Sequence, residues 1–211
     1  MSSGARARSG PEVRAIPRLP KGARIGVLGG SFNPAHAGHL HISRQLRKRL
    51  GLDQVWWLVS PQNPLKPASG MASLAKRLQG AKAVAKSDRH IVVTDIETGL
   101  GTQYTADTIE ALVRHAPGVR FVWLMGADNL VQIAQWRRWQ DIFKAVPVAV
   151  YGRPGYTRRA SASKAAQALA EYRLAEHDAR SLSARNAPAW VYLHGALSPV
   201  SATAIRARDQ G

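Results

Sequence analysis

Six short apolar runs separate stretches that have the spacing of amphipathic helices, and few folds accommodate such an alternation. The runs are 24–29, 54–59, 90–94, 119–125, 146–151 and 190–193. Strands that are apolar on both faces belong to parallel sheets whose two sides are covered by helices. Because crossovers between parallel strands are right-handed, consecutive strands build a doubly wound sheet. The sequence therefore predicts a Rossmann-like α/β fold, with a mainly parallel sheet of about six strands and helices on both faces.

The segments between the runs have the periodicity or the composition of helices. The first, 39–50, places three leucines on one face, and Gly51 follows as a stop signal. Segments 74–85 and 105–115 behave similarly, and 163–174 is rich in alanine and other good helix formers. These segments predict helices that connect successive strands.

Length and composition indicate one domain that follows a basic tail. The chain has 211 residues, of which 45% are hydrophobic, enough for a substantial core. Residues 1–21 are basic and rich in Gly, Ser and Pro. Such a start can mimic an organellar transit peptide, but we interpret it as a disordered tail before a single domain that spans 22–211.

The sequence predicts neither a membrane span nor a secretory signal peptide. No stretch approaches the roughly 18 apolar residues of a membrane span, and the start lacks the apolar core of a signal peptide. Cysteine is absent as well, which excludes disulfides and is compatible with a reducing compartment. We therefore expect a cytoplasmic protein without membrane contact.

The formal net charge of +17 comes from 30 Lys and Arg residues against 13 Asp and Glu residues. A nucleic-acid-binding protein would need such charge along one face. An enzyme that acts on polyphosphates also gains from a positive field, which steers anions to its site. A basic surface with no partner is the third alternative, and charge alone does not decide among them.

The strongest functional signal is the segment 29–39, GGSFNPAHAGH, which follows the first predicted strand directly. Doubly wound sheets bind ligands at the carboxyl ends of their strands. Glycines let the backbone approach an anion closely, and a helix that starts nearby adds N–H donors. The glycine spacing is neither the Gly-x-Gly-x-x-Gly dinucleotide fingerprint nor a Walker loop. We expect Gly30, Ser31 and Phe32 to lie at bound phosphates.

Two histidines, His36 and His39, flank Gly38 where this loop enters the helix. A glycine there removes the side chain that would keep a nucleotide from the helix start. Imidazole N–H groups can donate to phosphate oxygens and stabilise charge that develops in a transition state. Zinc binding and a purely structural role are the alternatives, but no cysteine or His-Glu-x-x-His pattern supports zinc. The pattern favours charge-stabilising histidines over metal ligands.

A second phosphate-binding pattern, SATAIR, occupies 201–206. Ser201 is a good N-cap, and a helix that begins there presents unpaired N–H groups to phosphate. Arg206 would lie one turn further and could neutralise a leaving pyrophosphate. Alone, this segment is also compatible with an ordinary capped helix that carries a surface arginine.

The two patterns together resemble the HxGH nucleotidylyltransferase superfamily, whose two histidines hold ATP and whose second motif is Ser/Thr-x-Thr-x-Ile-Arg. Three further segments, 102–108, 126–130 and 135–142, contain Tyr-Thr-x-Asp-Thr, Gly-Ala-Asp and Trp-x-x-Trp sequences. These sequences are similar to those of bacterial nicotinate-nucleotide adenylyltransferases, also called nicotinic acid mononucleotide adenylyltransferases. The resemblance covers residues 24–208.

The resemblance implies an enzyme of NAD biosynthesis that transfers the adenylyl group of ATP to nicotinate mononucleotide. The products are nicotinate adenine dinucleotide and pyrophosphate. Because a phosphate is already a competent nucleophile, no general base or covalent intermediate is required. Catalysis is then positioning and charge neutralisation, with Mg²⁺ held mainly by the phosphates of ATP and no metal site in the protein.

The resemblance also implies roles for individual residues. The implied catalytic residues are His36, His39 and Arg206. The implied ATP-binding residues are Gly30, Ser31, Phe32, Gly38, Lys66, Gly126, Asp128, Ser201 and Thr203. The implied mononucleotide-binding residues are Asn33, Tyr104, Thr105, Trp136 and Arg137, with Trp136 stacked on the pyridine ring. Lys66 ends an Asn-Pro-Leu-Lys sequence where many members have Pro-Pro-His-Lys, so the missing histidine leaves the role of that loop open.

Two alternatives remain at this stage. Phosphopantetheine adenylyltransferases use the same ATP chemistry on another phosphate, but they lack the Trp-x-x-Trp segment and are usually shorter. A nucleic-acid-binding protein would use the positive charge and release no pyrophosphate. The sequence does not decide how strongly nicotinate is preferred over nicotinamide mononucleotide, nor the oligomeric state.

Overall fold

The computed structural model describes residues 16–17, 19–61, 70–152 and 156–195. Its strands are β1 (Arg24–Gly30), β2 (Gln54–Val59), β3 (Ile91–Thr94), β4 (Arg120–Gly126), β5 (Val148–Tyr151), β6 (Arg173–Leu174) and β7 (Trp190–Leu193). Its α-helices are α1 (Ala37–Leu50), α2 (Leu74–Ala85), α3 (Ile96–Leu100), α4 (Thr105–His115), α5 (Ala127–Gln132), α6 (Trp139–Ala145), α7 (Thr157–Ser161) and α8 (Lys164–Ala168). Its 3-10 helices are η1 (Ile133–Gln135), η2 (Ala170–Tyr172) and η3 (Glu176–Ala184).

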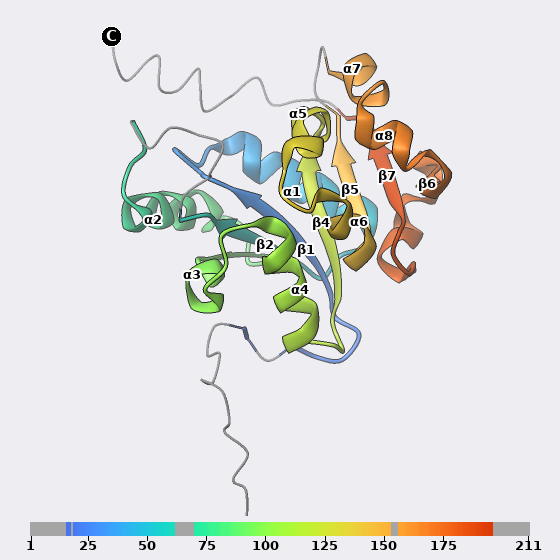
Figure 1. Cartoon of the computed structure of the whole chain (residues 1–211). Helices are drawn as coiled ribbons and strands as arrows, with labels where there is room; N and C mark the ends of the chain where they lie inside the picture. Colours follow the sequence, from blue (N-terminus) through green and yellow to red (C-terminus); the bar gives the residue numbers. More distant parts are fainter. Residues whose placement is uncertain (1–15, 18, 62–69, 153–155, 196–211) are drawn as a thin grey trace, which may run out of the picture.

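The strands form one sheet in the order β3-β2-β1-β4-β5-β7-β6, and every neighbouring pair is parallel. From β1 the order runs outward through β2 and β3 on one side, and through β4, β5, β7 and β6 on the other. This is the doubly wound arrangement that the sequence predicts (Figure 1).

The prediction of about six strands was one too low for the described residues, because β6 lies within the segment 163–174 that we expected to be helical. That segment instead contains α8, then η2, then the two-residue strand β6, which pairs with β7. Helix propensity is a weak preference that tertiary contacts override. Here the indole N–H of Trp190 donates to the carbonyl of Leu169 just after α8, and the guanidinium of Arg173 lies 5.3 Å from the Trp190 ring centroid.

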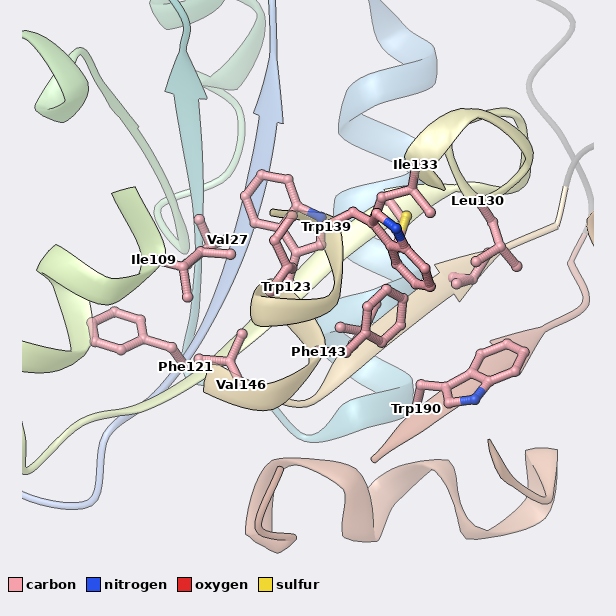
Figure 2. Packing of buried hydrophobic residues seen from close by; sticks show 14 of the residues in the cluster. Val27, Ile109, Phe121, Trp123, Leu130, Ile133, Trp139, Phe143, Val146 and Trp190 are labelled. Atoms are coloured by element: carbon pink, nitrogen blue, oxygen red, sulfur yellow. The ribbon is translucent and has the colours of Figure 1, made fainter. Parts of the chain in front are cut away.

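Both faces of the sheet are buried, which explains why the strands read as continuous apolar runs. Successive residues of a strand point to opposite sides, so Trp56 belongs to one core cluster and Trp57 to the other. The first cluster packs beneath helices α3 to α8, and the second beneath α1, α2 and η3. Figure 2 shows part of the first cluster, with Trp139 and Phe143 of α6 packed over the sheet. Apolar contacts with the first cluster extend back to Ile16 and Leu19.

Two predicted helices, 74–85 and 105–115, coincide with α2 and α4. The predicted helix 39–50 begins two residues earlier than expected, at Ala37, and ends at Gly51 in the left-handed conformation with φ 64°. No helix in the described parts of the chain is long and apolar enough to cross a membrane.

Candidate functional site

The point at which the strand order reverses lies between β1 and β4. The loop after β1 enters α1, which covers one face of the sheet, whereas β4 leads directly into α5 on the opposite face (Figure 1). Doubly wound sheets bind ligands where two such connections diverge. The sequence-predicted phosphate loop and Gly126–Asp128 segment both lie at this point.

The two histidines of the loop cap helix α1 in a reciprocal manner. His36 is the N-cap, and its Nδ1 accepts a hydrogen bond of 3.1 Å from the backbone N–H of Gly38. Nδ1 of His39 accepts one of 3.2 Å from the backbone N–H of His36. A backbone N–H only donates, so in each ring the proton of the neutral imidazole is on Nε2. The caps therefore fix both histidines in the tautomer that donates through Nε2.

Aromatic side chains support the histidines from the core side. The ring centroids of His36 and His39 lie 3.9 Å apart, and that of Phe32 lies 4.8 Å from that of His39. Phe32 stacks in turn on the fully buried Trp57, at 5.1 Å, and the Trp57 indole donates to Ser43 of α1 at 2.7 Å. The Phe32 side chain is thus part of the core, and its backbone adopts the left-handed conformation with φ 47°.

Close packing at the end of β1 explains the glycine at position 29. A Cβ atom there would lie 2.5 Å from Cη2 of Trp123 on the neighbouring strand β4. At Gly30 a Cβ would meet the Phe32 ring at 3.3 Å. These glycines let aromatic rings cover the strand from which the loop departs.

Asn33 and Arg77 connect the loop after β1 to the polypeptide beyond β2. The Asn33 amide donates to the carbonyl of Gly70 at 3.1 Å and accepts from the N–H of Ala72 at 3.3 Å. Arg77, which is 3% exposed, donates to the carbonyl of Ser31 at 2.7 Å. Burial lowers the pKa of its guanidinium. Asn33 therefore has a structural role in holding this loop, whatever it contributes to a substrate.

The residues that we predicted to bind the mononucleotide come from two neighbouring elements. Tyr104 is the N-cap of α4, Thr105 is its first residue, and the Arg137 guanidinium lies 4.6 Å from the centroid of the Tyr104 ring. Trp136 is half-buried at the end of η1 and packs against the first core cluster. Trp139, three residues later, is a core side chain that contacts Phe143 edge to face (Figure 2).

Arg138 fastens these two elements together. It precedes α6 in the left-handed conformation, with φ 54°, which is uncommon for a residue with a side chain. Its guanidinium pairs with Asp107 and Glu110 of α4 and with Asp141 of α6. Hydrogen bonds to Glu110 and Asp141 raise its pKa above the ordinary value. The segment that carries Trp136 is thereby held against the start of α4.

Gly126 ends β4 and is the N-cap of α5, whose first turn contains Asp128. An acidic residue in the first turn of a helix is favoured by the helix dipole. The four remaining predicted site residues, Lys66, Ser201, Thr203 and Arg206, lie outside the described residues. Among the residues that the structure describes, no three His, Cys, Asp or Glu side chains form a group that could hold a metal ion.

Sequence reasoning missed three polar residues at the site: Arg77, Glu97 and Arg138. The pKa of Glu97, a 7% exposed carboxyl on α3, is raised by burial, which hydrogen bonds with Ser60 and Thr108 oppose. Arg77 and Glu97 occur in ordinary helical contexts, and their partners are distant in sequence. Arg138 lies two residues after Trp136. The only sequence signal for its ion pairs is the presence of the acidic residues Asp107 and Asp141 in the two segments.

The arrangement defines a nucleotide-binding α/β protein, with a histidine-capped loop at the switch point of a parallel sheet. A model of the cytidylyltransferase-like family matches residues 27–208. A relative from Parvibaculum lavamentivorans, named "Probable nicotinate-nucleotide adenylyltransferase", is 55% identical over 90% of this chain and 94% of its own length. A relative of the same name from Methylorubrum extorquens is 54% identical over 88% of this chain and 100% of its own.

Solved structures share the fold at low sequence identity. The Plasmodium falciparum nicotinic acid mononucleotide adenylyltransferase complexed with NaAD has a TM-score of 0.64 and 14% identity, over 88% of this chain and 83% of its own. The same enzyme complexed with APC gives 0.63. The family match and the close relatives show that the chain belongs to the cytidylyltransferase-like family and, within it, to the nicotinate-nucleotide adenylyltransferases.

Proposed function

We propose that this protein transfers the adenylyl group of ATP to nicotinate mononucleotide, giving nicotinate adenine dinucleotide and pyrophosphate. The observation that carries the proposal is the identity of 50–55% to relatives named for this activity, over nearly the whole chain. The histidine-capped loop, placed where this fold binds ligands, supports it independently. A family match over 27–208 also supports the hypothesis of a single domain over 22–211.

In the proposed reaction an oxygen of the mononucleotide 5′-phosphate attacks the α-phosphorus of ATP. A new P–O bond forms as the bond to the bridging oxygen of pyrophosphate breaks, and the electron pair leaves with pyrophosphate. His36 and His39 would donate through Nε2 to the phosphates, where their stabilisation grows as charge accumulates. Since each ring is oriented by a backbone N–H, the donors require little reorganisation when the substrate binds.

The mononucleotide would bind between the start of α4 and the Trp136 segment. An indole stacks favourably on an electron-poor pyridine ring. Backbone N–H groups at Tyr104 and Thr105 begin a helix of 11 residues, and unpaired N–H groups at a helix start suit a carboxylate. Arg137, beside Tyr104, would add a positive charge for an anionic substrate. This half of the site thus supports the assignment of nicotinate, whose carboxylate is negative, rather than nicotinamide, whose carboxamide is uncharged.

Nucleotidyltransferases use a divalent metal with ATP, and we propose that Mg²⁺ serves here. Mg²⁺ would arrive as part of the substrate, bound to the ATP phosphates. We further propose a cytoplasmic location, with which the absence of cysteine is compatible.

The proposal is tested by pyrophosphate release from ATP and Mg²⁺ with three acceptors, each in a separate reaction. We expect turnover with nicotinate mononucleotide, weaker turnover with nicotinamide mononucleotide and none with phosphopantetheine. Mass spectrometry should find nicotinate adenine dinucleotide in amounts equal to the pyrophosphate. Turnover with phosphopantetheine but not with nicotinate mononucleotide would refute the assignment.

A further inference from the structure

A buried chain of polar contacts begins at Arg77, on α2. Its Nη1 donates at 2.7 Å both to the carbonyl of Ser31, in the loop after β1, and to the carbonyl of Ser60, just after β2. Its Nη2 donates to the carbonyl of Pro61 at 2.8 Å, and its Nε to that of Ala72 at 2.9 Å. The planar fork of a guanidinium is suited to such fixed, divergent contacts.

The acceptors around Arg77 are neutral, which is unusual for a buried cation. The side chain is 3% exposed, and no carboxylate forms an ion pair with it within the described residues. Buried charges are normally paired because desolvation is costly. If Arg77 served only to fill space, the desolvation of its charge would lower stability with nothing to offset it. Its contacts instead hold the connections that follow β1 and β2 in one relative position.

The chain continues from Ser60 to the start of α4. The Ser60 hydroxyl is hydrogen-bonded to the Glu97 carboxyl. Oε1 of Glu97 accepts at 3.2 Å from the hydroxyl of Thr108, which is fully buried on α4. That hydroxyl also lies 3.2 Å from the carbonyl of Tyr104 and 2.9 Å from the hydroxyl of Thr102. The last contacts hold the turn from which α4 begins.

The two ends of this chain are therefore the two halves of the site. Ser31 belongs to the loop proposed to hold ATP, and Tyr104 to the start of α4, which is proposed to hold the mononucleotide. We infer that Arg77, Glu97 and Thr108 are positioning residues that set these halves at the separation required for in-line transfer. The inference rests on the proposed function, because it assigns the halves to the two substrates. Small errors in the alignment of reacting groups lower kcat strongly.

The test uses the whole protein and measures kcat with both substrates saturating. Thr108→Val keeps the shape of the side chain but removes the hydroxyl, and Thr108→Ser is its matched control. Arg77→Lys keeps the charge but loses the fork. We expect Thr108→Val and Arg77→Lys each to lower kcat by about tenfold or more, and Thr108→Ser to stay near wild type. ATP binding alone, measured by calorimetry, reports whether each variant keeps its ATP half.

The double variant, Arg77→Lys with Thr108→Val, decides whether the residues act through one chain. If both residues act through the same chain of hydrogen bonds, the second substitution should lower kcat little further than the first. We therefore expect the double variant to have a kcat close to that of the single variant with the lower kcat. Effects that multiply would overturn the inference, as would single variants that alter only one KM or only the melting temperature. Wild-type protein that releases no pyrophosphate with nicotinate mononucleotide would refute the proposed function itself, before any variant is compared.

Discussion

His36 has two separable roles, as the N-cap of α1 and as a hydrogen-bond donor to phosphate. Two substitutions should separate them, because His36→Ala should lower Tm more than His36→Asp, whereas His36→Asp should lower activity more than His36→Ala. Alanine removes the Nδ1 atom that accepts from Gly38 N–H at 3.1 Å. Loss of an N-cap costs about 1 kcal/mol, which corresponds to a fall in Tm of about 2–4 °C for a chain of this size. His36→Ala also removes the Nε2 donor, and we expect kcat to fall at least about tenfold.

Aspartate restores the cap but cannot donate. Asp is among the best N-cap residues, and its charge is favourable at a helix start, so the Tm of His36→Asp should equal or exceed that of wild type. Its carboxylate repels the triphosphate, and at contact distance this repulsion is of the order of several kcal/mol. We therefore expect kcat/KM for ATP to fall further than in His36→Ala.

Differential scanning calorimetry and the pyrophosphate assay together measure both roles. If His36→Asp lost as much Tm as His36→Ala, the cap would be wrongly assigned. If His36→Asp kept the wild-type rate, the donor role would be refuted, and the histidine would be a structural residue.

Three further predictions test other parts of the structure. Gly29→Ala places a Cβ 2.5 Å from the Trp123 ring, and its free energy of unfolding in urea should fall by about 1–3 kcal/mol. The matched control is Gly80→Ala on α2, where a Cβ meets nothing within 4 Å, and there the free energy of unfolding should rise by about 0.5–1 kcal/mol. Equal effects of the two substitutions would contradict the packing at Gly29. Burial raises the pKa of Glu97, so its contribution to stability is lost as the pH rises through that raised value. Glu97→Gln should therefore gain stability relative to wild type as the pH rises above the ordinary carboxyl pKa, and a difference that does not change with pH would refute this. Trp136→Ala should raise the KM for nicotinate mononucleotide with little change in that for ATP, and an unaltered KM would argue against stacking.

Local patterns were sufficient for most of the fold. Helices α2 and α4 begin and end where their apolar periodicity does, and the six apolar runs became strands of one parallel sheet. This succeeded because each strand is buried on both faces, so that its composition alone marks it. The small strand β6 could not be found in this way: its pairing with β7 depends on Trp190 and on residues about 20 positions away.

The same division holds at the candidate site. Sequence alone selected the loop with His36 and His39, because glycines and imidazoles after a first strand have few other uses. Only the structure showed that Nδ1 of both histidines accepts a backbone N–H at the start of α1, which leaves Nε2 as the nitrogen that donates. Only the tertiary structure revealed Arg77 and Glu97, because their contacts join segments that the sheet brings together and the sequence keeps apart. Periodicity predicts what is buried, whereas the partner of a buried charge is decided by topology.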